Sequence, residues 1–197
     1  MVEVVYLLRH AAPPECARAR YWGRTDPGVD RDGLVPLAGM PSLLWPKAEK
    51  LLASPLPRTI ETAAVLSHSL GLPVVRVPKL AEADFGFFEG LTFAEAAERF
   101  PEAVSEWGRL GDRFSFPGGE SVAAFLERAR QAWEDCLSLP DRTVLAVTHG
   151  GIIAAWCCLF LRISFSRRFA FRADYAALTA FVRGENGWDL VFFNNLA

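Results

Sequence analysis

Short apolar runs along the chain predict the strands of a buried sheet. Val2–Leu8 is almost continuously apolar and rich in Val and Leu, which is typical of a central strand covered on both faces. Further strands are predicted at Lys50–Ala53, Val74–Val77 and Thr143–Val147. Near the end of the chain, Ala177–Arg183 and Trp188–Phe193 flank Gly184-Glu185-Asn186-Gly187 and predict a closing hairpin.

Helical periodicity lies between these runs. The strongest signal is a set of apolar residues at i, i+3, i+4 and i+7 spacing that predicts one long helix. Its members are Val122, Phe125, Leu126, Ala129, Trp133, Cys136 and Leu137. Other helices are predicted from a Ser54-Pro55 cap to about Leu70, over Thr92–Phe100 and Pro101–Trp107, and onward from Gly151. Strands that alternate with helices predict an α/β sandwich with a mostly parallel sheet.

The region from Ala11 to Pro57 lacks this regularity. It holds eight of the 13 prolines, so we expect a wrapped loop region with short elements and no long helix there.

Composition and charge narrow the function classes. The 197 residues are 51% apolar and 22% charged, with a formal net charge of −2, which is the balance of one soluble globular domain. This charge gives no general attraction to nucleic acid or to an anionic membrane, so we predict neither partner. The four cysteines form no CxxC pair, which predicts reduced thiols in a cytoplasmic protein and no metal site.

A membrane-anchored protein is the alternative that Val144–Leu161 raises. These 18 residues carry no formal charge, but Thr148-His149-Gly150-Gly151 would place polar groups and two glycines in the middle of the bilayer. A strand, a turn and a helix explain the same residues, so we expect no span.

Two histidines and two arginines follow the predicted strands. His10 comes directly after the first strand with Arg9 beside it, and His149 follows the strand at Thr143–Val147. Arg58 falls in the first turn of the helix after the second strand, where free N–H groups favour an anion. Because carboxyl ends of parallel strands meet at one edge of a sheet, we expect a common site. Two guanidinium groups match the charge and geometry of a phosphate.

A neutral histidine among such charges is a good nucleophile. Neighbouring positive charge lowers an imidazole pKa and keeps a lone pair available, while the arginines stabilise a transferring phosphoryl group. An acid is then needed for the leaving oxygen, and the Leu80–Gly90 segment offers Glu82, Asp84 and Glu89 among aromatic residues.

These residues stand in five motifs that resemble, in the same order, those of the histidine phosphatase superfamily, which has the phosphoglycerate mutase-like fold. The resemblance covers almost the whole chain. The motifs are Leu7-Leu8-Arg9-His10, Ser54-Pro55-Leu56-Pro57-Arg58-Thr59, Leu80–Gly90, Phe116-Pro117-Gly118-Gly119-Glu120-Ser121 and Val147-Thr148-His149-Gly150-Gly151. One departure is the helix usually found before the second motif, which is eroded into Leu34–Pro46.

The resemblance implies a three-layer sandwich in one domain over residues 1–197, with helices on both faces of the sheet and a small helical cap inserted at residues 85–121. It also implies a metal-independent phosphomonoesterase that needs no cofactor and acts on a small-molecule phosphate ester. In that enzyme His10 is the phosphorylated nucleophile and Glu82 the acid, while Arg9, Arg58 and His149 bind the phosphate.

Within the superfamily, Tyr21–Asp26, the proline-rich region and Phe85–Gly90 most resemble the α-ribazole phosphatase group. This implies α-ribazole 5′-phosphate as substrate and a place in cobalamin biosynthesis. The longer insertions typical of mutases are absent, which favours a phosphatase. A mutase-type phosphotransferase and a non-catalytic phosphate-binding protein are the alternatives.

Some residues keep two interpretations. Asp84 or Glu89 is an alternative to Glu82 as the acid. Arg24 either reaches the substrate, as we expect for Trp22, or pairs with Asp26. A solvated face is the default for the basic stretch at Arg162, Arg167, Arg168 and Arg172. Aromatic residues near the site either stack on a flat substrate or pack the cap. They are Tyr21, Trp22, Phe85, Phe87, Phe88, Phe93, Trp107, Phe114 and Phe116.

Overall fold

A six-stranded sheet of order β3-β2-β4-β1-β5-β6 forms the centre of the computed structural model, which describes residues 1–39 and 47–196. Strands β1 to β4 run parallel, and β5 and β6 form an antiparallel hairpin beside β1. The bounds are β1 Val4–Arg9, β2 Lys50–Ala53, β3 Val74–Arg76, β4 Thr143–Thr148, β5 Ala177–Gly184 and β6 Gly187–Leu196. The mostly parallel sheet and the closing hairpin that the sequence predicts are both confirmed.

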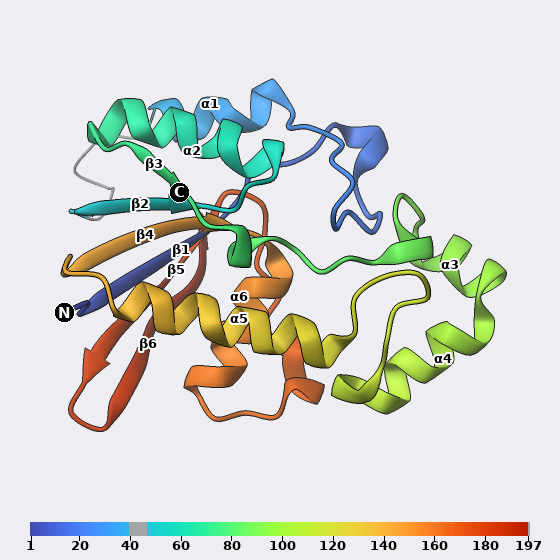
Figure 1. Cartoon of the computed structure of the whole chain (residues 1–197). Coiled ribbons are helices and arrows are strands. Elements are labelled where there is room, and N and C mark those ends of the chain that lie inside the picture. The colour runs from blue at the N-terminus through green and yellow to red at the C-terminus, as the bar shows by residue number, and fades with distance from the viewer. Residues whose placement is uncertain (40–46, 197) are drawn as a thin grey trace.

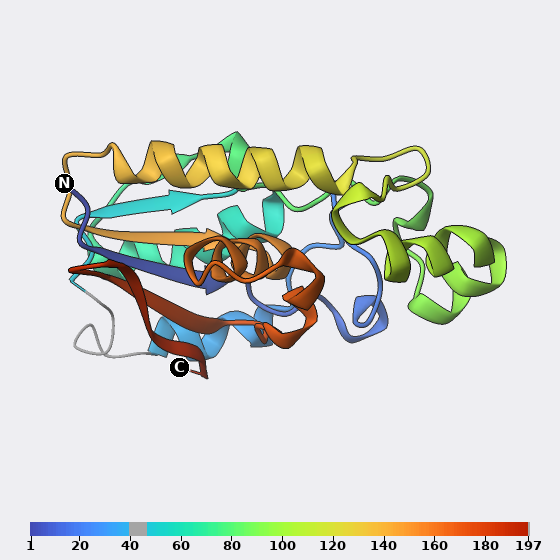
Figure 2. The same ribbon diagram turned by 90° about the horizontal axis from the view of Figure 1, so that it is seen from below.

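Helices cover both faces of the sheet because neighbouring strand residues point to opposite sides. In β1, Leu7 packs toward α5 (Val122–Leu137) and α6 (Gly150–Phe160), whereas Leu8 packs toward α1 (Arg31–Gly39) and α2 (Pro57–Leu70). Figures 1 and 2 show the resulting three layers. The three-layer sandwich is confirmed.

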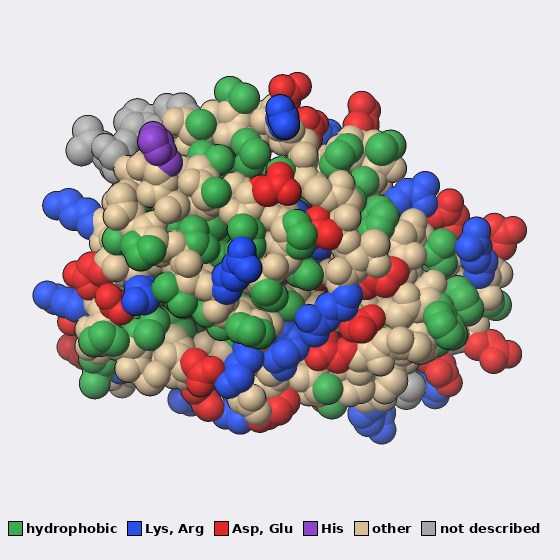
Figure 3. Space-filling view, turned by 45° about the horizontal axis from the view of Figure 1, so that its top comes forward, with side chains coloured by type: hydrophobic (Ala, Val, Ile, Leu, Met, Phe, Trp, Pro, Cys, Tyr) green, Lys and Arg blue, Asp and Glu red, His purple; other side chains and the backbone are tan. Residues whose placement is uncertain are grey.

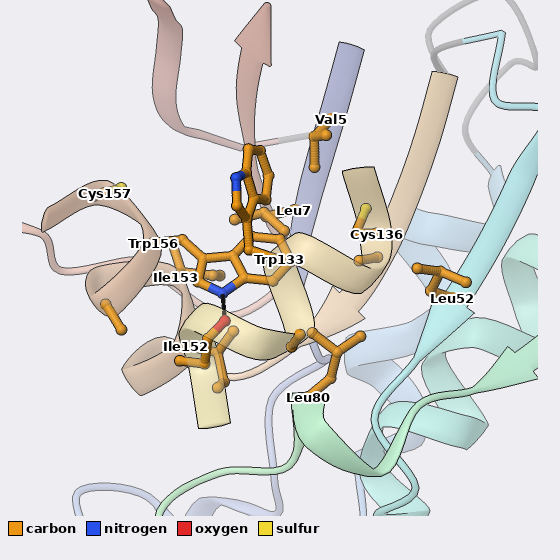
Figure 4. Close-up of a cluster of buried hydrophobic side chains, with 14 of the residues drawn as sticks. Val5, Leu7, Leu52, Leu80, Trp133, Cys136, Ile152, Ile153, Trp156 and Cys157 are labelled. Atoms are coloured by element: carbon orange, nitrogen blue, oxygen red, sulfur yellow. Dashed lines mark hydrogen bonds between the residues drawn. The ribbon is translucent and has the colours of Figure 1, made fainter. Parts of the chain in front are cut away.

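The core on the α5–α6 side is built around two tryptophans (Figure 4). The rings of Trp133 and Trp156 meet edge to face with centroids 4.9 Å apart. The buried Trp156 Nε1–H donates to the Ala129 carbonyl at 2.8 Å, so its polar group is satisfied. Burial raises the pKa of Cys136 and of Cys157 to about 12, so both remain thiols in the core.

A small helical cap stands beyond the carboxyl ends of the parallel strands (Figures 1 and 2). Its own core contains the buried rings of Phe88, Phe114 and Phe116. Its elements are η3 Gly86–Phe88, α3 Phe93–Arg99, α4 Pro101–Leu110 and η4 Gly111–Arg113. At the start of α3, Thr92 and Glu95 accept each other's backbone N–H, which satisfies two of the donors that a helix N-terminus leaves open.

The described part of the proline-rich region contains the short helix α1, with Pro36 inside it, and the single turn η1 (Glu15–Ala17), which agrees with the expectation of short elements. Of the stretch Leu34–Pro46, in which an eroded helix was expected, residues 40–46 lie outside the described part of the chain. The remaining short helices are η2 Pro78–Leu80 and η5 Phe165–Ala170.

The start of α2 corrects a prediction. Leu56 is its N-cap and Pro57 its first residue, whereas the sequence indicated Ser54 as the cap. Ser54 is fully buried, and its N–H continues the ladder of β2 by donating to the Val147 carbonyl at 3.0 Å. The Ser54 hydroxyl lies beside His149, in the site described below.

The segment Val144–Leu161 forms a strand, a turn and a helix, as predicted. None of the helices in residues 1–39 and 47–196 is long and apolar enough to cross a membrane. On the face shown in Figure 3, acidic and basic side chains are intermixed over the surface.

Candidate active site

A cleft of about 480 Å³ opens where the carboxyl ends of the parallel strands meet the cap. Five of the residues proposed from the sequence line it, namely Arg9, His10, Trp22, Arg58 and Glu82. They come from the last residue of β1 and the residue after it, the loop after η1, α2 and the loop after η2. The strand order therefore brings together segments that are far apart in the sequence.

His10 is held in one tautomer. Its Nδ1 lies 2.8 Å from the Ala11 carbonyl oxygen. Because a carbonyl only accepts, Nδ1 carries the proton and Nε2 keeps its lone pair. Burial, together with the charges of Arg9 and Arg58, lowers the pKa of His10 well below its usual value. The ring is therefore neutral at neutral pH and nucleophilic at Nε2.

His149 lies beside His10, with 5.2 Å between the ring centroids. It is the N-cap of α6, and its Nε2 is 2.7 Å from the Ser54 hydroxyl. Its Nδ1 is buried and makes no hydrogen bond within the described residues. Burial and the nearby charge of Arg58 lower the pKa of His149 well below its usual value. With Ser54 as the donor to Nε2, Nδ1 carries the proton and is a donor that has no acceptor in the described part of the chain.

Arg9 has one backbone partner and one aromatic partner. Its Nη1 donates to the Ala173 carbonyl at 2.6 Å, and its guanidinium carbon lies 3.8 Å from the centre of the Tyr175 ring. Its Nε is buried and unpartnered within the described residues. Burial lowers the pKa of Arg9, but an arginine stays a cation at neutral pH. Its charge is thus compensated only in part.

Arg58 is fixed by a loop from the other side of the cleft. Its Nη1 forms a buried ion pair with Asp26 at 2.8 Å, and its Nη2 donates to the carbonyls of Trp22 and Gly23 at 3.0 and 2.9 Å. The Arg58 N–H also donates to the Asp26 carboxylate at 3.2 Å. The anion favoured at this helix start is therefore Asp26. The alternative pairing of Asp26 with Arg24 is wrong, and the Arg24 side chain is exposed outside the cleft lining.

Three candidate acids have different surroundings. Glu82 is 7% exposed and lines the cleft, and its two oxygens accept the N–H groups of Ala83 and Gly151, each at 3.0 Å. Asp84 accepts the Gly86 N–H at 2.9 Å and is not among the lining residues. Geometry therefore favours Glu82 over Asp84.

Glu89 has a structural role. Its carboxylate accepts N–H groups from Gly23, Arg24, Thr25 and Phe85. These bonds attach the cap to the loop that holds Arg58, and Glu89 is absent from the lining of the cleft among the described residues.

Some of the aromatic residues lie where they could stack on a flat substrate, and others pack the cap. Tyr21, Trp22, Phe85, Trp107 and Phe116 line the cleft, whereas Phe88 and Phe114 are buried in the cap core. Phe87 and Phe93 are 64% and 60% exposed. Four of the lining rings also pack against one another, Trp22 being the exception.

Several residues of the cleft were missed from the sequence, among them Tyr175, Arg168 and Arg172. Tyr175 stacks on Arg9 and lies 5.5 Å from His10, ring to ring, and no pattern in the sequence marks it. Arg168 was placed on a solvated face, which is wrong: it is 9% exposed and lines the cleft. A buried arginine within a run of arginines gives no sequence signal of its own.

Comparison with known proteins decides the family. The sequence model of the histidine phosphatase superfamily (branch 1) matches residues 5–196. The chain belongs to this superfamily. A bifunctional protein of Mycobacterium tuberculosis is 38% identical over 147 residues, which are 73% of this chain and 40% of that protein. The matched segment is thus less than half of this longer relative. A metal-independent phosphoserine phosphatase of Arabidopsis thaliana is 31% identical over 169 residues, 83% of this chain and 69% of that protein.

Solved structures agree with this assignment. The mycobacterial glucosyl-3-phosphoglycerate phosphatase superposes with a TM-score of 0.84 at 25% identity, and the match covers 100% of both chains. The α-ribazole phosphatase of Shigella flexneri has a TM-score of 0.85 at 20% identity, over 98% of both chains. This second structure shares the fold, as the resemblance implied.

As a histidine phosphatase superfamily member, the chain presents a neutral histidine, two arginines and a carboxylate in one cleft. Within residues 1–39 and 47–196, no group of three or more His, Cys, Asp or Glu side chains is placed to hold a metal ion. The independence from metals stays a prediction.

Proposed function

We propose that this protein is a phosphomonoesterase that passes a phosphoryl group through His10 to water. The observation that carries the proposal is the state of His10. Its Nδ1–H is engaged by the Ala11 carbonyl, which leaves the lone pair on Nε2, and the residue lines a cleft that also contains Arg9, Arg58 and Glu82. A neutral imidazole beside two arginines whose buried Nε atoms make no hydrogen bond within the described residues fits a nucleophile for a phosphate ester.

In the first step, Nε2 of His10 attacks phosphorus and the bond from phosphorus to the leaving oxygen breaks. Arg9, Arg58 and the Nδ1–H of His149 bind the non-bridging oxygens and stabilise their charge. Glu82, in its acid form, gives its proton to the leaving oxygen, and the alcohol departs. The Ala11 carbonyl stabilises the proton that remains on Nδ1.

In the second step, water attacks phosphorus and the bond from phosphorus to Nε2 breaks. Glu82 now takes the proton of the water and returns to its acid form. The products are inorganic phosphate and neutral His10, so the cycle closes without a metal or a redox partner.

The aromatic lining supports a proposal for the substrate class. Trp22 lines the cleft with its Nε1–H bound to the Ala17 carbonyl at 2.6 Å, which fixes the ring. A small phosphate ester with a flat body fits this lining. α-Ribazole 5′-phosphate is the first compound to test, and the role in cobalamin biosynthesis and the cytoplasmic location stay predictions. Arg24 is not proposed as a substrate ligand.

The proposal is tested with p-nitrophenyl phosphate in EDTA. Wild type should release phosphate, and His10→Ala should lose about a thousandfold or more in turnover. His68→Ala is the matched control, because His68 is exposed on α2, and should keep wild-type activity. Activity that survives His10→Ala, or that needs a divalent metal ion, would contradict the proposal.

The mutase alternative is separated by the product. A mutase converts 3-phosphoglycerate to 2-phosphoglycerate, whereas a phosphatase releases inorganic phosphate. A non-catalytic phosphate-binding protein would bind phosphate and turn over none of these esters.

A further inference from the structure

Besides the two phosphate arginines, the cleft contains a third arginine that has a buried guanidinium nitrogen without a hydrogen bond to any described residue. Across residues 1–39 and 47–196, three arginines have a buried guanidinium nitrogen that makes no hydrogen bond: Arg9 Nε, Arg58 Nε and Arg168 Nη2. All three line the same cleft. Two of them are accounted for by the phosphate of the substrate, and Arg168 remains.

Arg168 lies on η5, the short helix that follows α6. Its Nη1 has one long hydrogen bond, 3.4 Å, to the Phe165 carbonyl. Arg168 takes part in none of the ion pairs formed by the described residues. Its charge is therefore buried without a counter-charge.

Arg128, a partly buried arginine of this protein, shows how a structural role is satisfied. Arg128 forms two bonds to the Glu120 carboxylate and donates to the carbonyls of Lys79, Ala81 and Glu82. Its full set of donors is used to hold the loop that carries Glu82. Arg168 has no comparable set, so a structural role does not explain its burial.

Aromatic rings surround Arg168 in place of acceptors. Its guanidinium carbon lies 4.2, 4.9 and 5.7 Å from the ring centres of Phe169, Phe165 and Trp107. Such contacts stabilise the cation but accept none of its in-plane N–H groups, and Nη2 has no acceptor among the described residues. Burial also lowers the pKa of Arg168. A buried cation of this kind is stabilised when an anion reaches its free N–H groups.

We propose that Arg168 binds a second anionic group of the substrate, a carboxylate or a second phosphate, while Arg9 and Arg58 hold the phosphate to be cleaved. The proposal rests on the phosphatase function proposed above. It deepens that function by naming a class of substrate that carries a second anionic group, besides the phosphate to be cleaved, on an apolar body. α-Ribazole 5′-phosphate has no second anionic group, so it would not use Arg168.

The experiment compares two esters that differ only in the second anion. They are 4-(carboxymethyl)phenyl phosphate and 4-methylphenyl phosphate, which have similar leaving groups. A charged hydrogen bond in a closed site corresponds to about a ten- to hundredfold preference. Wild type should show that preference for the carboxylate ester in kcat/KM. Arg168→Met should reduce it to about one, and Arg168→Lys should keep part of it.

The matched control is Arg167→Met. It removes the same charge from the same short helix, but Arg167 is exposed and outside the cleft lining, so the preference should remain. The rate on 4-methylphenyl phosphate reports whether Arg168→Met is folded. A second readout is inhibition of wild type by inorganic pyrophosphate compared with phosphate, where the additional charge should tighten binding in an Arg168-dependent way.

The outcomes separate the two proposals. Equal kcat/KM for both esters in wild type would overturn the role of Arg168 and leave the phosphatase function intact, whatever the variants do. A preference that survives Arg168→Met would also overturn it. Hydrolysis of neither ester, or hydrolysis that survives His10→Ala, would overturn both proposals.

Discussion

The rings of His10 and His149 face each other with centroids 5.2 Å apart at the ends of the neighbouring parallel strands β1 and β4. Both are buried, and for both the pKa lies well below the usual histidine value because of burial and the adjacent arginines. Two protonated imidazoles this close, with Arg9 and Arg58 nearby, would repel one another.

This relationship predicts the pH dependence of activity. Since the nucleophile is already neutral at pH 6.5, kcat/KM should not fall as the pH drops through that value. The acid limb of the kcat/KM pH profile, after correction for titration of the substrate, should lie well below pH 6.5. Arg58→Gln removes a charge that lowers the pKa of His10, so the limb should move to higher pH. A wild-type limb near pH 6.5 would contradict the described state of His10.

The Asp26–Arg58 ion pair predicts a second effect. Asp26→Asn leaves the buried Arg58 cation without its counter-charge, and we expect a loss of about 1–3 kcal/mol in the free energy of unfolding. Asp26→Asn should also raise KM for phosphate esters several-fold, because the Arg58 guanidinium group is no longer held in place. Glu127→Gln is the control, since Glu127 pairs with Arg130 at the surface and should change neither quantity. Unchanged stability in Asp26→Asn would contradict the importance of this pair.

The role of Glu82 is tested through the leaving group. Glu82→Gln should slow hydrolysis of alkyl phosphates far more than that of p-nitrophenyl phosphate, whose leaving oxygen needs little protonation. Asp84→Asn changes a carboxylate outside the cleft lining. It should not slow hydrolysis of alkyl phosphates more than that of p-nitrophenyl phosphate. Equal losses on both esters in Glu82→Gln would remove Glu82 from the acid role.

Tyr175 supplies a prediction that the sequence did not offer. Its ring covers the Arg9 guanidinium at 3.8 Å, a contact worth about 0.5–2 kcal/mol. Tyr175→Leu should raise KM about two- to thirtyfold, and Tyr175→Phe should restore most of the affinity because it keeps the ring. If Tyr175→Leu and Tyr175→Phe raise KM equally, the aromatic ring is not what orders Arg9.

Apolar periodicity predicted the strands of the sheet and the helices outside the proline-rich region, and the shared edge of parallel strands predicted the meeting of His10, Arg9 and Arg58. Helices on both faces of the sheet were implied by the family resemblance. The partners of these side chains could not be predicted. Asp26 reaches Arg58 through a loop without regular structure, and Ser54 was assigned to a helix cap although it is buried beside His149. The burial of Arg168 depends on the packing of η5 against the cap, which a run of arginines does not reveal.

Direct trapping of the phosphoenzyme tests the central claim. Wild-type protein mixed with ³²P-labelled p-nitrophenyl phosphate and quenched within milliseconds should carry up to one phosphoryl group per chain, acid-labile and base-stable, on the peptide that contains His10. His10→Ala should carry none, and His68→Ala should match wild type. Turnover by wild type with no label on His10, or label on another residue, would contradict the account.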